Sequence, residues 1–327
     1  MQERQPALMS APEATVYRGN CHCGAFVFRI ALPALDAAPP QAYSICRKKG
    51  YLTAQVPAPR RRGGDGVMAS TVARMCVVLT ADLVGAVLRD VRRGAGDRVP
   101  RPRVGDLLVQ CASPFPHPAR ADAAQTRLLQ DVDFRKWVPR MRPDQSAATP
   151  YPTPTYSGLA ALTAELQPGE KIYPGSCHCG AVTFALRTPP LDNPAVEVKE
   201  CDCSLCLRLG PILTYPSPLT RAPYHKRTPG ALGPKMISYQ FCSTCGVCVF
   251  LAVHGPPDAV VATLPPARQA LVKAKREIRP VNVRALDFFL GREEGEREER
   301  GRVEARVERT RGSAEGAAYV VPGPEGE

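Results

Sequence analysis

Seven cysteines fall in three short groups in the second half of the chain, and thiolates are soft, strong ligands for zinc. The groups are residues 177–179 (Cys-His-Cys), 201–206 (Cys-Asp-Cys-Ser-Leu-Cys) and 242–245 (Cys-Ser-Thr-Cys). Because zinc takes four ligands in a tetrahedron, these thiols divide naturally into four and three. A site closed by four thiolates is structural. Three thiolates leave one position for water or substrate, which is the condition for zinc chemistry.

The spacing within the groups predicts which thiols share an ion. A C-x-C or C-x-x-C pair reaches a metal from one side only, because so short a peptide cannot wrap around it. The two outer pairs therefore suit each other as the ligands of one structural zinc: Cys177, Cys179, Cys242 and Cys245. Gly246 follows the last of them and permits the turn of a zinc knuckle, in which backbone N–H groups point at sulfur.

The inner triplet of Cys201, Cys203 and Cys206 is compact enough to hold a second ion by itself. Its open fourth position predicts a catalytic zinc. The alternative is a second structural zinc with Asp202 or His225 as its fourth ligand. Spacing alone does not separate these two interpretations.

Disulfide bonds are the other use of closely spaced cysteines, and the sequence argues against them. Residues 1–16 contain Glu3, Arg4 and Glu13 and no apolar core, so no secretory signal is predicted. The 13 cysteines are odd in number, and a C-x-C disulfide is strained. No apolar run reaches the length of a membrane span. We therefore expect reduced thiols in a cytoplasmic, alternatively nuclear, protein that contacts no membrane.

The three groups and their flanking residues resemble a known family. The strings Gly-Ser-Cys-His-Cys-Gly-Ala-Val at 175–182, C-x-C-x-x-C at 201–206 and Phe-Cys-x-x-Cys-Gly at 241–246 are similar to the motifs of glutathione-dependent formaldehyde-activating enzymes. That family includes centromere protein V. The resemblance covers residues 173–290 well and residues 17–137 poorly. It implies a small β-tent of packed antiparallel sheets, a structural zinc on the outer four cysteines and a catalytic zinc on the inner three. It also implies carbon–sulfur lyase chemistry on S-hydroxymethylglutathione, the adduct of formaldehyde and glutathione.

An internal repeat accompanies these motifs. Tyr-Arg-Gly-Asn-Cys-His-Cys-Gly at 17–24 recurs as Tyr-Pro-Gly-Ser-Cys-His-Cys-Gly at 173–180, and Ser-Ile-Cys at 44–46 echoes Ser-Leu-Cys at 204–206. The first copy has Gln41 and Tyr43 where the second has the first two cysteines of its triplet. Its remaining candidate ligands are Cys21, Cys23 and Cys46. No C-x-x-C-G follows them, so a closed zinc site is not expected in this copy.

The sequence therefore predicts a mostly β protein built from two tandem, zinc-binding, β-tent-like domains. The degenerate first copy spans residues 15–137 and the intact second copy spans residues 172–291. A proline-rich linker at 138–171 joins them. The segment 291–312, which opens the C-terminal tail of residues 292–327, alternates Glu and Arg between glycines. This tail is expected to be disordered, with an exposed helix as the alternative.

Residues 53–125 interrupt the first copy with sequence rich in Arg, Gly, Ala, Val and Pro that has neither a strand nor a helix period. We interpret this segment as an irregular insert that is translated intron sequence or a misjoined gene model. The alternative is a basic insert that binds nucleic acid, because Arg60, Arg61 and Arg62 are clustered. Interleaved aromatic residues are absent, so nucleic acid is not an expected partner.

Alternation of apolar and polar residues predicts the strands that deliver the cysteines. Strands are expected at residues 181–187, 196–200, 247–253 and 281–286, with a helical turn at 159–166 and an irregular loop at 211–234. The segment 235–242 leads into the second knuckle. His178 should point away from a metal held by its neighbours, to the surface or behind a ligand. Tyr239 and His225 are candidate acids or bases, although a plain core or loop role is the simpler interpretation. Cys248 is expected to be a buried, inert thiol.

The open zinc position determines the predicted function. Three thiolates against a dication make an electron-rich zinc, which exchanges a substrate thiol better than it activates water. We therefore predict a zinc-dependent carbon–sulfur lyase with two Zn²⁺ ions in the second copy. Its substrate would be a small thiol–aldehyde adduct, with glutathione as the first candidate thiol. The alternative is a zinc-stabilised binding module without catalysis, associated with chromatin, which the net charge of +12 favours.

Overall fold

The computed structural model describes residues 14–20, 22, 27–35, 44–55, 123–132, 151–216, 229–232 and 236–311. Strands and helices are mixed in this part of the chain. The predicted β-sheets are present, but the prediction of a mostly β protein did not include the helices that accompany them. The described strands form one sheet of seven strands and three sheets of two strands each. No helix within these ranges has the length and apolar character needed to cross a lipid bilayer.

The large sheet carries most of the cysteine-bearing segments. In spatial order its strands are β13 (Glu308–Thr310), β7 (Val198–Cys201), β8 (Leu213–Thr214), β12 (Val281–Asn282), β11 (Cys248–Val253), β10 (Ile237–Phe241) and β9 (Pro229–Leu232). Each strand predicted between 196 and 286 overlaps one of them. The expected irregular loop at 211–234 is wrong in part, because it contributes β8 and β9. The last predicted strand ends early and continues as the 3-10 helices η4 (Val283–Ala285) and η5 (Asp287–Leu290).

A hairpin packs against this sheet and closes the main core. Its strands are β5 (Lys171–Ser176) and β6 (Thr183–Thr188), which pair antiparallel. The ring of Phe184 on β6 meets the ring of Phe250 on β11 edge to face, with centroids 4.8 Å apart. Cys177 and Cys242 are buried in the same core, at 0% and 2% exposure. The outer cysteine group is therefore built into the centre of this half of the protein.

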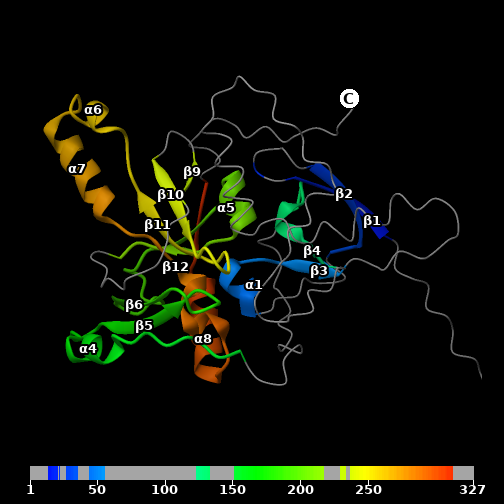
Figure 1. Ribbon diagram of the computed structural model, residues 1–327, viewed down its shortest axis with the longest axis horizontal. Helices are drawn as coiled ribbons and strands as arrows, with labels where there is room; N and C mark the ends of the chain where they lie inside the picture. The colour runs from blue at the N-terminus through cyan, green and yellow to red at the C-terminus, as the bar shows by residue number, and fades with distance from the viewer. Residues whose placement is uncertain are drawn as a thin grey trace, which may run out of the picture.

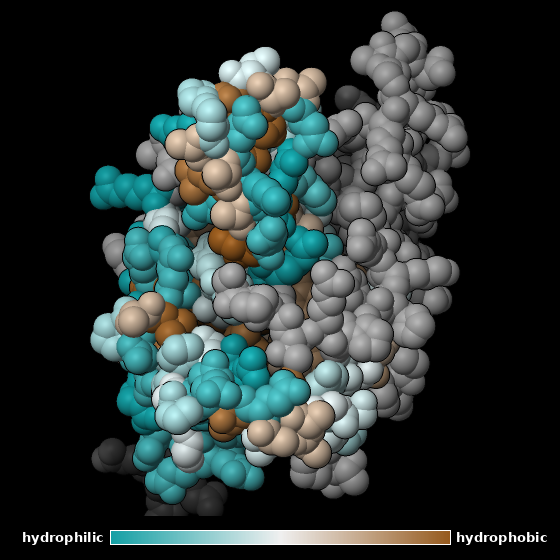
Figure 2. All heavy atoms as spheres, turned by 90° about the vertical axis from the view of Figure 1, so that its left-hand side faces the viewer, coloured by the Kyte–Doolittle hydropathy of each residue, from teal (hydrophilic) through white to brown (hydrophobic). Residues whose placement is uncertain are grey.

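Two helices that the sequence pattern did not predict project from the sheet (Figure 1). They are α6 (Asp258–Val261) and α7 (Pro266–Glu277). Proline at the first position of α7 is favourable, because that N–H has no partner in a helix. No residue of α7 is buried, although the helix is amphipathic, so its period was present in the sequence but was not recognised. This side of the protein is mainly hydrophilic with small apolar patches (Figure 2).

The expectation of a disordered tail from residue 292 is wrong as far as residue 311. Helix α8 (Glu294–Ala305) begins with a capping box between Glu293 and Glu296, and its Val303 is fully buried in the main core. Strand β13 follows and pairs with β7, where the backbone N–H of Asp202 donates to the carbonyl of Thr310 at 3.2 Å. The mixed-charge sequence hid this segment, because one buried valine anchors a helix that is otherwise polar.

The first copy keeps the backbone plan of the second. Its hairpin of β1 (Ala14–Asn20) and β2 (Val27–Pro33) pairs Tyr17 with Ile30, as β5 and β6 pair Tyr173 with Leu186. Helix α1 (Ser44–Lys49) matches α5 (Ser204–Leu209). The short strands β3 (Thr53–Gln55) and β4 (Ala123–Gln125) and the 3-10 helix η2 (Thr126–Leu128) complete it. Its small core consists of Ile30, Leu32, Leu35, Leu52 and Leu129.

Several predictions fall on residues outside the described ranges. They concern Cys21 and Cys23, the body of the insert at 56–122, His225 and the final residues 312–327. Within the expected linker, the helical turn is confirmed as α4 (Leu159–Ala164).

Candidate metal centres

The outer four cysteines lie on two matching turns. Cys177 follows β5 and Cys242 follows β10. Each donates its backbone N–H to the residue five positions on, Val182 or Val247, at 2.9 Å. Gly180 and Gly246 occupy the left-handed region in these turns, with φ of 81° and 68°. The two outer pairs predicted from spacing are therefore presented by two equivalent knuckles.

The separations between the outer sulfurs fit a tetrahedral ion and exclude a covalent link. Cys179 Sγ lies 3.6 Å from the Sγ atoms of both Cys177 and Cys242. All four sulfurs, that of Cys245 included, lie within 4.8 Å of one another. A zinc–sulfur bond of about 2.3 Å places tetrahedral sulfurs about 3.8 Å apart, whereas a disulfide needs about 2.05 Å. All the cysteines in the described ranges are free. The prediction that these residues can hold a metal ion is confirmed at the level of geometry.

Hydrogen bonding prepares the outer sulfurs for a cation. The backbone N–H of Val182 donates to Cys177 Sγ at 3.3 Å. A hydrogen bond from Cys177 lowers the pKa of Cys179 to about 6, and the same sharing of protons raises the pKa of Cys177. Thiols this close cannot all ionise without a positive charge among them. A bound dication would supply that charge.

The inner triplet is gathered by the end of one strand and the start of one helix. Cys201 is the last residue of β7, Cys203 caps the N-terminus of α5, and Cys206 lies in the first turn of that helix. Their three sulfurs lie within 4.8 Å of one another. Backbone N–H groups of Cys203 and Cys206 donate to the sulfurs of Cys201 and Cys203, at 3.4 and 3.5 Å. The predicted second group is thus also close enough to share an ion.

The three inner thiols differ in acidity. Hydrogen bonds from Cys203 and then Cys206 lower the pKa of Cys201 to about 2. Hydrogen bonds to Cys201 and Cys203, together with burial, raise the pKa of Cys206 well above its ordinary value. Hydrogen bonds among the three sulfurs thus favour a thiolate within the group, and the thiolate is the form that binds a metal.

Positive charge lies close to the strand that delivers the triplet. Glu200 on β7 has guanidinium groups of Arg127 and Arg284 each at 4.0 Å. Burial lowers the pKa of Arg127 to about 10 and also lowers that of Arg284. Arg309 of β13 also lies 4.0 Å from this carboxylate, so three guanidinium groups gather around the strand that delivers the triplet.

Tyr239, a candidate acid or base, touches the triplet directly. Its hydroxyl lies 2.9 Å from Cys206 Sγ, and its side chain is buried. Burial, and then the charge of Cys206, raise the pKa of Tyr239, so the phenol stays protonated at neutral pH. It can therefore donate a hydrogen bond to a thiolate at Cys206. Cys248 is buried as predicted, and burial raises its pKa to about 12.

Tyr239→Phe tests this contact. The variant is expected to weaken metal affinity at the inner triplet by about tenfold, because a hydrogen bond behind a ligand typically contributes tenfold to a hundredfold. The outer ion should be unaffected. Tyr173→Phe is the matched control, since the hydroxyl of Tyr173 bonds Glu299 Oε1 at 3.0 Å and the Leu191 N–H at 2.8 Å, away from the cysteines. Competition with a chromophoric chelator measures both sites, and equal inner affinities in the two variants would contradict the assignment.

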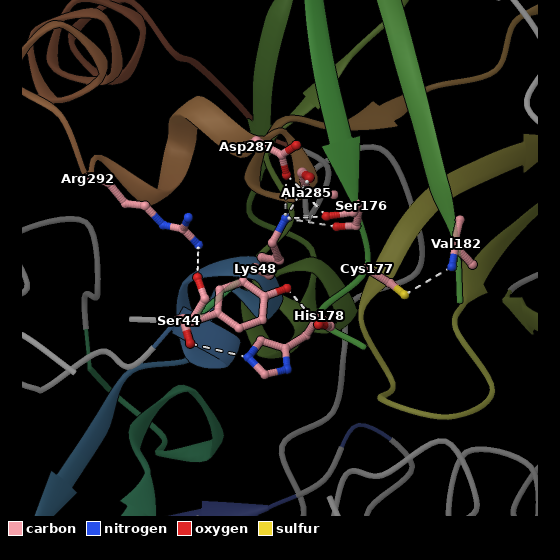
Figure 3. A network of polar contacts seen from close by, with 10 residues as sticks. Ser44, Lys48, Ser176, Cys177, His178, Val182, Ala285, Asp287 and Arg292 are labelled. Carbon is pink, nitrogen blue, oxygen red and sulfur yellow. Dashed lines mark hydrogen bonds and ion pairs between the residues drawn. The ribbon is translucent and has the colours of Figure 1, made fainter. Parts of the chain in front are cut away.

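His178 lies in the interior and not at the surface. Its side chain is 3% exposed and stacks on Tyr151, with centroids 4.3 Å apart and planes at 9°. Its Nε2 lies 3.2 Å from Ser44 Oγ, and its carbonyl accepts a bond from the Tyr151 hydroxyl at 2.6 Å (Figure 3). The metal-compatible groups among the described residues do not include it. Of the two predicted places, the surface is wrong, and His178 packs behind the outer cysteines.

Sequence reasoning missed the residues that the first copy brings to both centres. Ser44 and Lys48 of α1 reach the outer group, and His22 lies with its Nδ1 2.9 Å from Ser204 Oγ at the inner one. The repeat itself was the available signal, because two copies of one domain can meet through a self-complementary surface, as the subunits of a two-fold dimer do. Cys46 is buried in α1 at the place that Cys206 holds in α5.

Comparison with known proteins identified no relative of this chain. No protein-family model, curated protein or solved structure matches the chain.

Proposed function

We propose that this protein is a zinc-dependent carbon–sulfur lyase that makes or breaks a thiol–aldehyde adduct such as S-hydroxymethylglutathione. The observation that carries the proposal is the division of seven sulfurs into a group of four and a group of three, each within 4.8 Å. Four thiolates complete a tetrahedron, and three leave one position for a ligand that is not part of the chain. The proposal includes the β-tent arrangement of sheets that the motif resemblance implies.

Each residue of the inner centre has a role in this proposal. When bound, zinc supplies a Lewis acid and a point of attachment for a substrate thiolate. Cys201, Cys203 and Cys206 would hold the ion from one side, and their three negative charges would disfavour activation of water. Tyr239 keeps its proton and donates to Cys206, which limits the charge on that sulfur. These features favour exchange of thiols over hydrolysis.

A non-catalytic binding module remains the alternative function, and one surface supports it. Helix α7 has no buried residue, and its Arg268, Lys273 and Lys275 are exposed. Basic side chains on a projecting helix suit a polyanion such as nucleic acid. In that case both cysteine groups would serve only to stabilise the fold.

The full-length chain distinguishes the two functions. Elemental analysis of protein purified without chelator should give two zinc ions per chain. S-hydroxymethylglutathione is prepared from formaldehyde and glutathione. The zinc-loaded protein should accelerate the exchange between this adduct and free formaldehyde. Two ions without turnover, together with a salt-dependent shift of labelled duplex DNA, would support the binding module. A single ion, or none, would contradict the proposed lyase.

A further inference from the structure

The two copies contact each other through bonds that repeat with their roles exchanged. Lys48 of α1 donates to the carbonyl of Ser176 at 2.9 Å and to its hydroxyl at 3.2 Å. Arg208, at the equivalent position of α5, donates to the carbonyl of Asn20 at 3.0 Å and to its side-chain oxygen at 3.1 Å. Asn20 and Ser176 are equivalent as well, since each ends the first strand of its hairpin. One contact is thus the counterpart of the other.

A second matched pair joins the start of each helix to the other copy. Ser44 Oγ lies 3.2 Å from His178 Nε2, and Ser204 Oγ lies 2.9 Å from His22 Nδ1. Each serine begins its helix, and each histidine stands between the two cysteines of its copy's first motif. The correspondence therefore extends to the residues between the candidate ligands.

Two glycines mark the centre of this arrangement. Gly50 and Gly210 follow α1 and α5 with φ of 72° and 64°. A Cβ added to Gly210 would lie 2.7 Å from the carbonyl oxygen of Gly50, so the two helix ends approach backbone to backbone. In a two-fold dimer each contact occurs twice, with the roles of the two subunits exchanged. Here the two copies within one chain make such an interface.

The largest departure from symmetry is the environment of Lys48. Its side chain is fully buried, and its Nζ also reaches the carbonyl of Ala285 at 3.1 Å and Asp287 Oδ1 at 3.0 Å (Figure 3). A buried ammonium is costly unless hydrogen bonds satisfy it. All of its acceptors belong to the second copy, and Ser176 directly precedes the ligand Cys177. The first copy thus places a fully hydrogen-bonded ammonium group at the end of β5, directly before Cys177.

We propose that the first copy acts as a built-in second subunit whose Lys48 and Ser44 are positioning residues for the four-cysteine centre of the second copy. Lys48 fixes the carbonyl and hydroxyl of Ser176, and Ser44 fixes His178, so the two residues around Cys177 are held by α1. A copy that has lost two cysteines of its own triplet would be retained for this role. The inference rests on the proposed function in so far as the centre binds zinc.

The test follows metal release from the outer centre of the full chain. All variants are made in a Cys203→Ser background, so that the remaining ion belongs to the four cysteines. Lys48→Met is expected to accelerate transfer of zinc to a chromophoric chelator by about tenfold, the lower end of the effect of losing a bond behind a ligand. Lys48→Arg should restore slow release, because arginine serves at the equivalent position 208. Lys49→Met is the matched control, since Lys49 lies over the Tyr51 ring of its own copy, 5.4 Å from the centroid.

A second variant guards against a chain that fails to fold. Ser44→Ala removes the contact with His178 without leaving a buried charge unpaired, and should accelerate release about threefold. Circular dichroism identifies which variants are folded. Release as slow as in the parent from folded Lys48→Met or Ser44→Ala protein would overturn the inference and leave the proposed function intact. A parent chain that takes up no zinc would contradict the proposed function itself, and the inference with it.

Discussion

Replacing Cys242 by serine is expected to unfold the metal-bearing half of the protein at a temperature where the parent chain is stable. Cys242 is 2% exposed and belongs to the same core as Phe184 and Val249. Structural zinc contributes roughly 10–16 kcal/mol to the folding of zinc-finger peptides. Loss of one of four ligands should remove a large part of that contribution, at least about 4 kcal/mol. Thermal unfolding followed by circular dichroism measures the change.

Two controls separate loss of metal from loss of packing. Cys248→Ser alters another buried thiol, on β11, that lies outside both cysteine groups, and should cost only about 1–2 kcal/mol. Chelation of the parent chain should reproduce the instability of Cys242→Ser. If chelation left the melting temperature unchanged, the outer group would not be a structural zinc site.

Replacing Cys203 by serine is expected to abolish turnover while the fold survives. Cys203 is partly exposed and lies at the start of a helix, at the edge of the buried core. Its loss leaves the inner ion two ligands, so the zinc content should fall from two ions to one. A Lewis acid contributes several kcal/mol to a transition state, and each 1.36 kcal/mol is tenfold in rate. Exchange of the glutathione–formaldehyde adduct should therefore slow by at least about a thousandfold.

Comparison of the two cysteine variants gives the sharpest result. Cys203→Ser should melt within a few degrees of the parent chain, because a change outside the core costs little. Cys242→Ser should melt far below both. Equal melting temperatures would mean that the two centres have the same role, which contradicts a division into a structural and a catalytic ion.

The sequence was sufficient to predict the cysteine groups because their evidence is local. Spacing within each group fixed Cys177 with Cys179 and Cys201 with Cys206, and the structure brings the two outer pairs together. Alternation predicted the strands of the second copy within a few residues. Each of these signals lies within one short segment, where the residue types limit the available conformations.

The features that were missed depend on contacts between distant segments. Helix α8 is recognisable only once Val303 is seen in the core, because its neighbours are charged. In the sequence, Lys48 is one of three consecutive basic residues on a short helix. Its buried position is evident only from its acceptors on the other copy. Periodicity cannot report such contacts, because each residue's partner lies far along the chain.

The pairing of β13 with β7 has a consequence for how the protein is made. Thr310 lies beside Cys201 in the finished sheet, yet the ribosome adds it long after the triplet has emerged. Until then the edge next to Cys201 has no neighbour, and its backbone groups face solvent. Segments fold in the order of their synthesis, so the inner triplet reaches its final surroundings late. Both cysteine groups thus depend on the last segment to emerge, because Val303 of α8 completes the core around Cys177 and Cys242, and β13 completes the sheet beside Cys201.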